Sequence, residues 1–81
     1  MTSELISEYD IFLGHLTLYN NRIEIKRNPL TEIIIIRNIT SIDENPFNHS
    51  MVIKTSDKKN HPISMKPSDI RALKEQIMSL L

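Results

Sequence analysis

The three histidines are the residues of this chain best suited to bind a metal ion, but their positions do not suit that chemistry. They are His15 on a segment that alternates like a strand, His49 in a predicted loop and His61 at the start of a later strand. A metal site needs several ligands that converge on one point and are held there by further partners. Because the histidines are far apart in sequence and share no ligand spacing, we expect surface residues and no metal site.

No catalytic motif occurs in the 81 residues. The chain has a single glycine and no cysteine, which excludes a glycine-rich phosphate loop and thiolate chemistry. Asp43 and Glu44 are an adjacent acidic pair, but neighbours on a strand point to opposite faces and do not form a general acid–base couple. We therefore expect a protein that is not an enzyme and that carries no cofactor.

Four basic residues are the candidates for holding an anionic ligand. They are Arg22 and Lys26, which share one face of a predicted strand, and Lys58 and Lys59 in a polar turn. Lys+Arg and Asp+Glu both number 10, so the chain lacks the basic excess of general nucleic-acid and membrane-surface binders. Solvated charge that keeps a sheet edge soluble is the favoured interpretation, and binding of an anionic lipid head group is the alternative. Nucleic acid ranks last, because the chain has only two tyrosines and two phenylalanines to stack bases.

Hydrophobic periodicity predicts that these side chains are carried mainly by antiparallel strands. Residues 12–19 and 22–26 alternate with a period of two, which puts Phe12 and Leu16 on the inward side. The two asparagines between these segments suit a tight hairpin. Further strands are predicted at residues 33–36, 38–42, 51–55 and 61–65, with a bend or bulge between the first two. The last strand is expected at a sheet edge, because Pro62 lacks an N–H.

The two ends of the chain are expected to differ. Residues 69–81 carry an apolar stripe that predicts one amphipathic helix packed on the chain's own strands, with Ser68 as its N-cap and Asp69 in its first turn. Residues 1–11 are predicted to be an N-terminal arm or a short helix outside a single domain at residues 12–81. No signal peptide or membrane-spanning stretch is recognised, and the lack of cysteine fits a reducing compartment, so a cytoplasmic location is expected.

Residues 14–23, GHLTLYNNRI, resemble the first hairpin of bacterial pleckstrin-homology-like and GRAM-type domains. Residues 34–42 resemble the strand pair that follows, and residues 51–58 the next hairpin. The resemblance covers about residues 12–81 and implies an antiparallel, partly open barrel of about six to seven strands capped by the C-terminal helix. Lipid-binding relatives carry several Lys and Arg around the first hairpin loop, whereas only Arg22 lies there in this chain. The fold hosts many functions, so the resemblance implies no single activity.

The run Ile33-Ile34-Ile35-Ile36 is the most informative feature of the sequence. Four consecutive residues of a strand place two side chains on each face, whereas a sheet with one wet face alternates. The resemblance implies that Ile34 and Ile36 point inward, leaving Ile33 and Ile35 outward, where Val52 is expected to join them. Two coverings of this outward face are considered equally. One is the chain's own residues 1–11, and the other is a partner protein or a second copy of the chain.

These observations predict a non-catalytic cytosolic module for protein interaction or self-assembly, with Ile33, Ile35 and Val52 as partner-binding candidates. A membrane adaptor that binds an anionic lipid through Arg22, Lys26 and the two lysines of the turn is the alternative. The leading hypothesis depends on the isoleucine run being a strand that is shielded from water on both faces.

Overall fold

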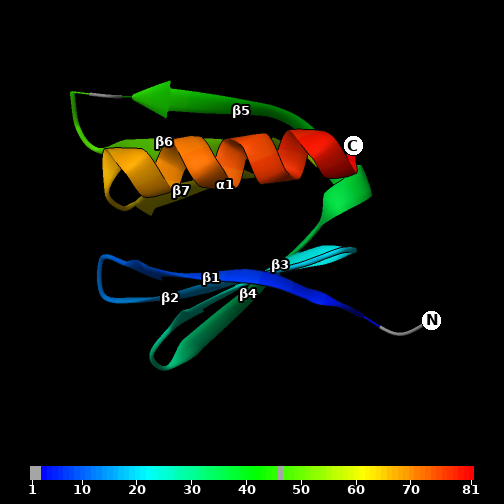
Figure 1. Ribbon diagram of the computed structural model, residues 1–81, viewed down its shortest axis with the longest axis horizontal. Helices are drawn as coiled ribbons and strands as arrows, with labels where there is room; N and C mark the ends of the chain where they lie inside the picture. The colour runs from blue at the N-terminus through cyan, green and yellow to red at the C-terminus, as the bar shows by residue number, and fades with distance from the viewer. Residues whose placement is uncertain (1–2, 46) are drawn as a thin grey trace.

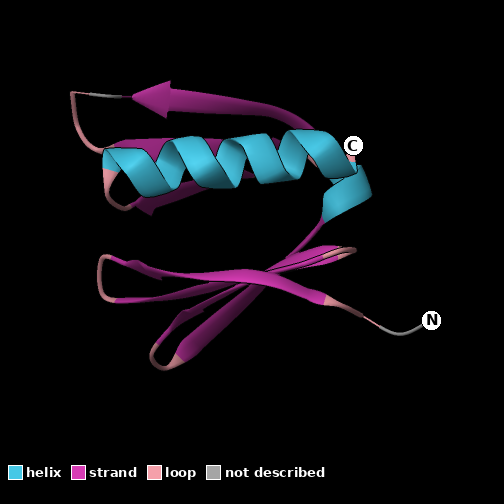
Figure 2. Cartoon of the chain, viewed as in Figure 1, coloured by secondary structure: helices cyan, strands magenta, loops and turns pink. Residues whose placement is uncertain are grey.

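Two antiparallel sheets and one helix make up the computed structural model, which describes residues 3–45 and 47–81 (Figure 1). The elements in chain order are β1 (Leu5–Ile11), β2 (Gly14–Tyr19), β3 (Arg22–Arg27), β4 (Leu30–Ile35), the 3-10 turn η1 (Ile36–Asn38), β5 (Ile39–Asn45), β6 (Ser50–Thr55), β7 (Asn60–Ser64) and α1 (Pro67–Leu80). One sheet has the order β1-β2-β3-β4 and the other β5-β6-β7. Figure 2 shows them as separate layers, with the helix alongside the three-stranded sheet. The expectation of a mainly β chain with one C-terminal helix is confirmed, but the described strands do not close into a barrel.

The N-terminal segment is a strand, and the prediction of an arm or short helix outside the domain is wrong. Strand β1 pairs with β2 along its length, with a register shift between Leu5 and Ser7. Such a bulge adds a residue to one strand and breaks its alternation. The period-two pattern is therefore weak in this segment. The pattern indicated about six strands and the resemblance six to seven, and the described residues form seven.

The β2–β3 hairpin forms as predicted, because its inward positions are all apolar. Leu16 pairs with Ile25 and Leu18 with Ile23, and all four side chains are buried. The prediction for Phe12 is wrong, since it lies in the β1–β2 turn with 69% of its surface exposed. Gly14 follows that turn, where a Cβ would lie 2.2 Å from the Lys26 carbonyl oxygen. The glycine thus permits the close approach of β2 to the end of β3.

The isoleucine run ends where the chain changes sheets. Strand β4 stops at Ile35, and Ile36 begins the η1 turn that leads into β5. The bend expected before Ile39 is therefore this turn. It is followed by a bulge in β5 between Ile39 and Ser41, opposite β6. Strand β7, which contains Pro62, is an edge strand as predicted.

Helix α1 begins earlier than predicted. Lys66 is the N-cap and Pro67 occupies the first helical position, where the missing N–H of proline costs nothing. Ser68 is therefore inside the helix, and Asp69 lies in the first turn as expected. The helix is fixed to the opposite sheet by Gln76, whose Oε1 accepts hydrogen bonds from Ser7 Oγ at 2.8 Å and Tyr9 Oη at 2.6 Å.

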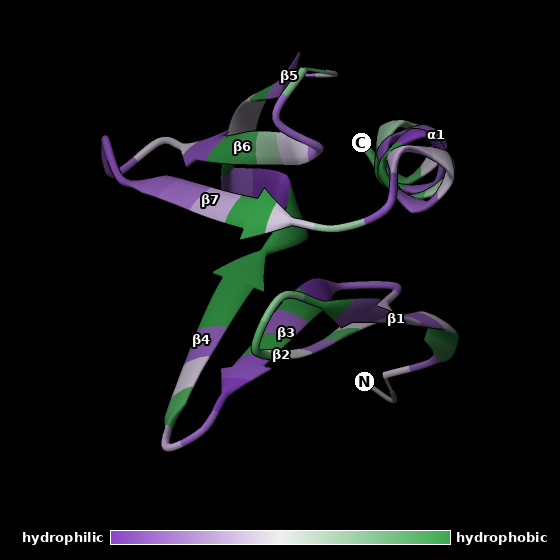
Figure 3. Cartoon of the chain, turned by 90° about the vertical axis from the view of Figure 1, so that its left-hand side faces the viewer, coloured by the Kyte–Doolittle hydropathy of each residue, from purple (hydrophilic) through white to green (hydrophobic). Residues whose placement is uncertain are grey.

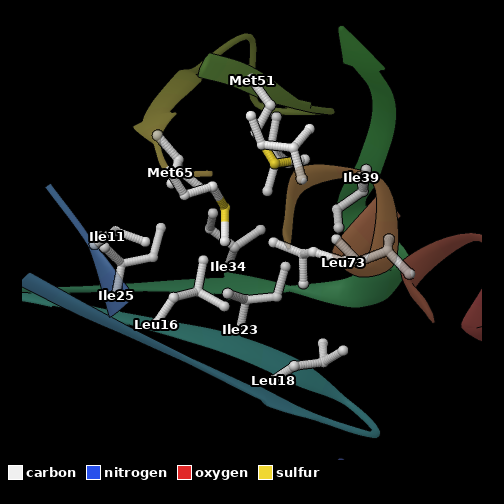
Figure 4. Close-up of a cluster of buried hydrophobic side chains, with 14 of the residues drawn as sticks. Ile11, Leu16, Leu18, Ile23, Ile25, Ile34, Ile39, Met51, Met65 and Leu73 are labelled. Carbon is white, nitrogen blue, oxygen red and sulfur yellow. The ribbon is translucent and has the colours of Figure 1, made fainter. Parts of the chain in front are cut away.

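The core lies between the two sheets and the helix. Figure 4 shows Leu16, Ile23 and Ile34 of the four-stranded sheet directed toward Met65 and Leu73. Two further hydrogen bonds join the sheets directly: Phe12 N donates to Ser64 O at 2.9 Å, and Arg27 Nη2 donates to Pro62 O at 2.6 Å. The buried side chains of both sheets pack against one another and against the helix in this core. Any surface for a partner is therefore expected on the outer faces and edges.

Candidate functional site

The outer face of β4 carries two exposed isoleucines. Ile34 and Ile36 are 2% and 4% exposed, whereas Ile33 and Ile35 are 57% and 38% exposed. The predicted inward and outward orientation is therefore confirmed. Figure 3 shows this C-terminal half of β4 as a continuous hydrophobic segment. We call Ile33 and Ile35 the β4 face.

No other part of the described chain covers the β4 face. The order β1-β2-β3-β4 puts β1 at the opposite edge of the same sheet. Ile33 is 57% exposed, so residues 3–11 do not cover it, and this segment approaches the face only at Ser3, whose Oγ accepts a hydrogen bond from Arg22 opposite Ile35. The expectation that the isoleucine run is shielded from water on both faces is not met within a single chain.

The surface next to the β4 face is electrically balanced. Ile33 pairs with Glu24 of β3, and Ile35 pairs with Arg22. The two charged side chains bond each other, with Arg22 Nε donating to Glu24 Oε2 at 2.7 Å. The guanidinium of Arg22 also lies over the ring of Tyr19, 4.1 Å from its centroid. The isoleucines thus border a neutralised ion pair and an aromatic ring.

A groove continues the apolar surface beyond Ile35. It has a volume of about 680 Å³ and is lined by Asn20, Asn21, Ile35, Ile36, Arg37, Leu80 and Leu81. This groove was not predictable from the sequence, because its walls come from the β2–β3 turn, from the end of β4 and from the C-terminal helix. The leucine side chains expected to pack on the strands are partly left at the surface here, with Leu81 57% exposed.

Val52 does not belong to the β4 face, and the prediction that it joins this patch is wrong. It lies in β6 of the three-stranded sheet, between Asp43 of β5 and Pro62 of β7. Asp43 in turn forms an ion pair with Lys54, whose Nζ lies 3.0 Å from Asp43 Oδ2. Val52 is half-buried among polar neighbours in the other sheet, which leaves only two of the three predicted partner-binding residues side by side.

The four candidate cations for an anionic ligand are divided between the two sheets. Arg22 and Lys26 lie on β3, whereas Lys58 and Lys59 lie in the turn that joins β6 to β7. Arg22 is half-buried and bonded to Glu24. The structure therefore presents no single strand face on which all four charges gather.

The turn that contains the two lysines is organised by an acid. Asp57 Oδ1 accepts hydrogen bonds from the hydroxyl of Thr55 and, at 3.2 Å, from Lys59 N. The hydrogen bond from Thr55 is the main reason that the pKa of the Asp57 carboxyl lies below its ordinary value of 3.8. Lys59 is thus part of a turn that already contains a carboxylate, that of Asp57.

The histidines lie in three different environments. His15 is 3.3 Å from Asp10 and 3.7 Å from Glu8 on the outer face, and His49 lies in the β5–β6 loop. The expectation of a surface residue is wrong for His61, whose side chain is 12% exposed, with Nδ1 3.7 Å from Glu32. Over residues 3–45 and 47–81, no group of three or more potential metal-binding side chains comes together.

Comparisons with known proteins leave the chain without a relative to argue from. No family model matches it, and searches of curated proteins and of solved structures found no match. Among the described residues, no helix has the length and apolarity needed to cross a bilayer. The functional argument therefore depends on the surface itself.

Proposed function

We propose that this chain is a non-catalytic cytosolic interaction module that self-associates through the β4 face. The observation that carries the proposal is the exposure of Ile33 and Ile35 beside a neutralised ion pair, on a strand whose inward Ile34 is buried in the core. An exposed apolar patch with a polar rim is typical of protein–protein contact. We also propose a pleckstrin-homology-like fold, supported by seven antiparallel strands in two sheets followed by a helix.

The energetic scale indicates how much surface the contact must use. Full burial of one isoleucine is worth about 1.5–3 kcal/mol, and Ile33 and Ile35 are already partly buried. Association costs about 4–15 kcal/mol in lost rotational and translational freedom. Two isoleucines are therefore insufficient by themselves. A stable contact must add backbone hydrogen bonds or the neighbouring groove.

Light scattering tests the proposal. Wild-type protein is expected to run as a dimer or larger assembly, and the double variant Ile33→Asp/Ile35→Asp as a folded monomer, because two buried unpaired carboxylates oppose association. Leu5→Asp is the matched control, since Leu5 is also 57% exposed but lies on β1 at the opposite edge. It is expected to leave the assembly intact. A wild-type protein that stays monomeric at high concentration would remove the proposal.

A sedimentation assay separates this function from the membrane alternative. With anionic vesicles at low salt, where charge attraction is strongest, we expect the protein to stay in the supernatant. The reason is that Arg22 is already paired with Glu24 and that Lys58 and Lys59 lie in the other sheet, away from Lys26. Sedimentation that disappears in a Lys26→Ala/Lys58→Ala/Lys59→Ala variant would instead favour the lipid-binding function.

A further inference from the structure

We infer that the free edge of β4 pairs antiparallel with β4 of a second copy, joining two four-stranded sheets into one. This inference rests on the proposed function and gives it a geometry. Pairing of the two strands supplies the backbone hydrogen bonds that must be added to the burial of two isoleucines. Addition of a strand to an exposed sheet edge is a common mode of protein association.

A comparison of the four sheet edges selects β4. Proteins protect free edges with bulges, proline, outward charges or inward-pointing charges. The edge strand β1 has a bulge at Leu5 and Ser7, β5 has a bulge at Ile39 and Ser41, and β7 contains Pro62. Strand β4 has neither a bulge nor a proline, since its register with β3 is unbroken from Leu30 to Ile35, and its one charge is the inward-pointing Glu32.

The outward side chains of β4 also carry no charge that would oppose the approach of another strand. Its outward positions are Thr31, Ile33 and Ile35, none of which is charged. The one charged residue of the strand is Glu32, which belongs to the inward row and contacts Arg27 Nη1 at 3.3 Å. Glu32 is thus an inward-pointing charge at this edge, and its carboxylate is already paired with Arg27 and lies 3.7 Å from His61 Nδ1.

The phase of the ladder shows which backbone groups the edge offers. Ile36 N donates to Asn21 O at 3.1 Å, while Arg22 lies opposite Ile35. In an antiparallel ladder the hydrogen-bonded residues alternate, so Ile36, Ile34, Glu32 and Leu30 bond to β3. The N–H and C=O groups of Thr31, Ile33 and Ile35 therefore point away from β3. Within residues 3–45 and 47–81, no other strand pairs with this side of β4.

Strand β4 is complementary to itself. A two-fold axis through Ile33 places it opposite Ile33 of the second copy, and places Thr31 opposite Ile35 of that copy. This register uses every backbone group that points to the free edge, and it continues the β4 face across both copies. In an isologous contact residue i meets residue j of the second copy and j meets i, so like charges in the outward row would lie opposite or diagonal to one another and repel. The outward row of β4 contains no charge, which favours a second copy as the occupant.

Single cysteines test this register, since the natural chain contains no cysteine. In Ile33→Cys the two Cα atoms are expected about 5.5 Å apart, within disulfide range. Mild oxidation should therefore double the 9.4 kDa mass on non-reducing gels. In Ile35→Cys the equivalent Cα atoms would be about 13 Å apart along the strands, too far to bridge. The double variant Thr31→Cys/Ile35→Cys should cross-link again, because these positions face each other.

The outcomes distinguish the geometry from the function. Efficient cross-linking of Ile33→Cys and of the double variant, but not of Ile35→Cys alone, supports edge pairing. If the wild-type protein is oligomeric and Ile35→Cys cross-links as well as Ile33→Cys, the contact is face to face and the edge geometry is overturned. If the wild-type protein is monomeric and Ile33→Cys stays unlinked, the proposed function fails together with the inference.

Discussion

Arg22 shows at the residue scale why exposed charge is a poor guide to ligand binding in this chain. Its side chain bonds Glu24 and Asn21 and stacks on Tyr19. An incoming phosphate would have to compete with the carboxylate, which is already in charge-assisted contact at 2.7 Å. Arg22, the basic residue beside the first hairpin loop, is thus already held by neighbouring side chains of the sheet surface.

Asp57 provides a prediction for pH dependence. Its pKa lies below the ordinary 3.8 because Thr55 donates to it, so the unfolded chain binds the proton more tightly than the folded chain. Stability from this group is therefore complete above about pH 5 and is lost as the pH falls through the folded-state pKa. In urea unfolding curves at a series of pH values, Asp57→Asn should weaken the acid-induced loss of stability.

The control for this prediction is Glu75→Gln, at an exposed position of α1. It should follow the wild-type pH profile. An Asp57→Asn protein that loses stability below pH 4 as steeply as the wild type would show that the turn does not contribute to acid sensitivity.

At the scale of elements, the strands with clean alternation were predictable and the irregular ones were not. The β2–β3 hairpin follows from period-two burial, and the orientation of Ile33 and Ile35 follows from parity together with the family resemblance. Strand β1 was missed because its bulge breaks the pattern, and the start of α1 because Pro67 takes the first helical position. Pro62 marked β7 as an edge strand, but no such residue marks β4, so the free side of β4 required the strand order.

Helix α1 contributes to stability mainly through one buried row. Leu73 is fully buried, so Leu73→Ala leaves a cavity and is expected to cost about 2–5 kcal/mol of unfolding free energy. A chain of 81 residues has a small margin, so this variant should be largely unfolded near room temperature or melt far below the wild type. Circular dichroism with urea denaturation measures the change.

Met78 offers the matched comparison on the same helix. It is 57% exposed, so Met78→Ala should change the unfolding free energy by less than about 0.5 kcal/mol. Equal effects of the two substitutions would mean that α1 does not pack on the sheets as described.

At the scale of the whole molecule, the inner sides of the sheets pack into one core, whereas the outer faces and edges differ in how much apolar surface and free backbone they expose. The buried residues from both sheets and the helix form one core, while the exposed apolar residues of β4 continue into the groove at Leu80 and Leu81. Of the described edges, β1 and β5 carry a bulge and β7 carries a proline, whereas β4 has only the inward-pointing Glu32. This asymmetry directs association to one side of the molecule, as expected for a closed dimer and not for an open fibre.

A closed dimer also makes thermal stability depend on protein concentration. When folded chains associate and unfolded chains do not, mass action stabilises the fold. Where the dimer dominates, a tenfold rise in concentration is worth about 1.4 kcal/mol per dimer, or about 0.7 per chain. For a domain of this size that corresponds to a rise in Tm of about 3–5 °C. Scanning calorimetry should show this rise for the wild type and for Leu5→Asp, and a constant Tm for Ile33→Asp/Ile35→Asp. A wild-type Tm that is the same at every concentration would mean that folding is complete in the single chain, with the β4 edge left to the solvent.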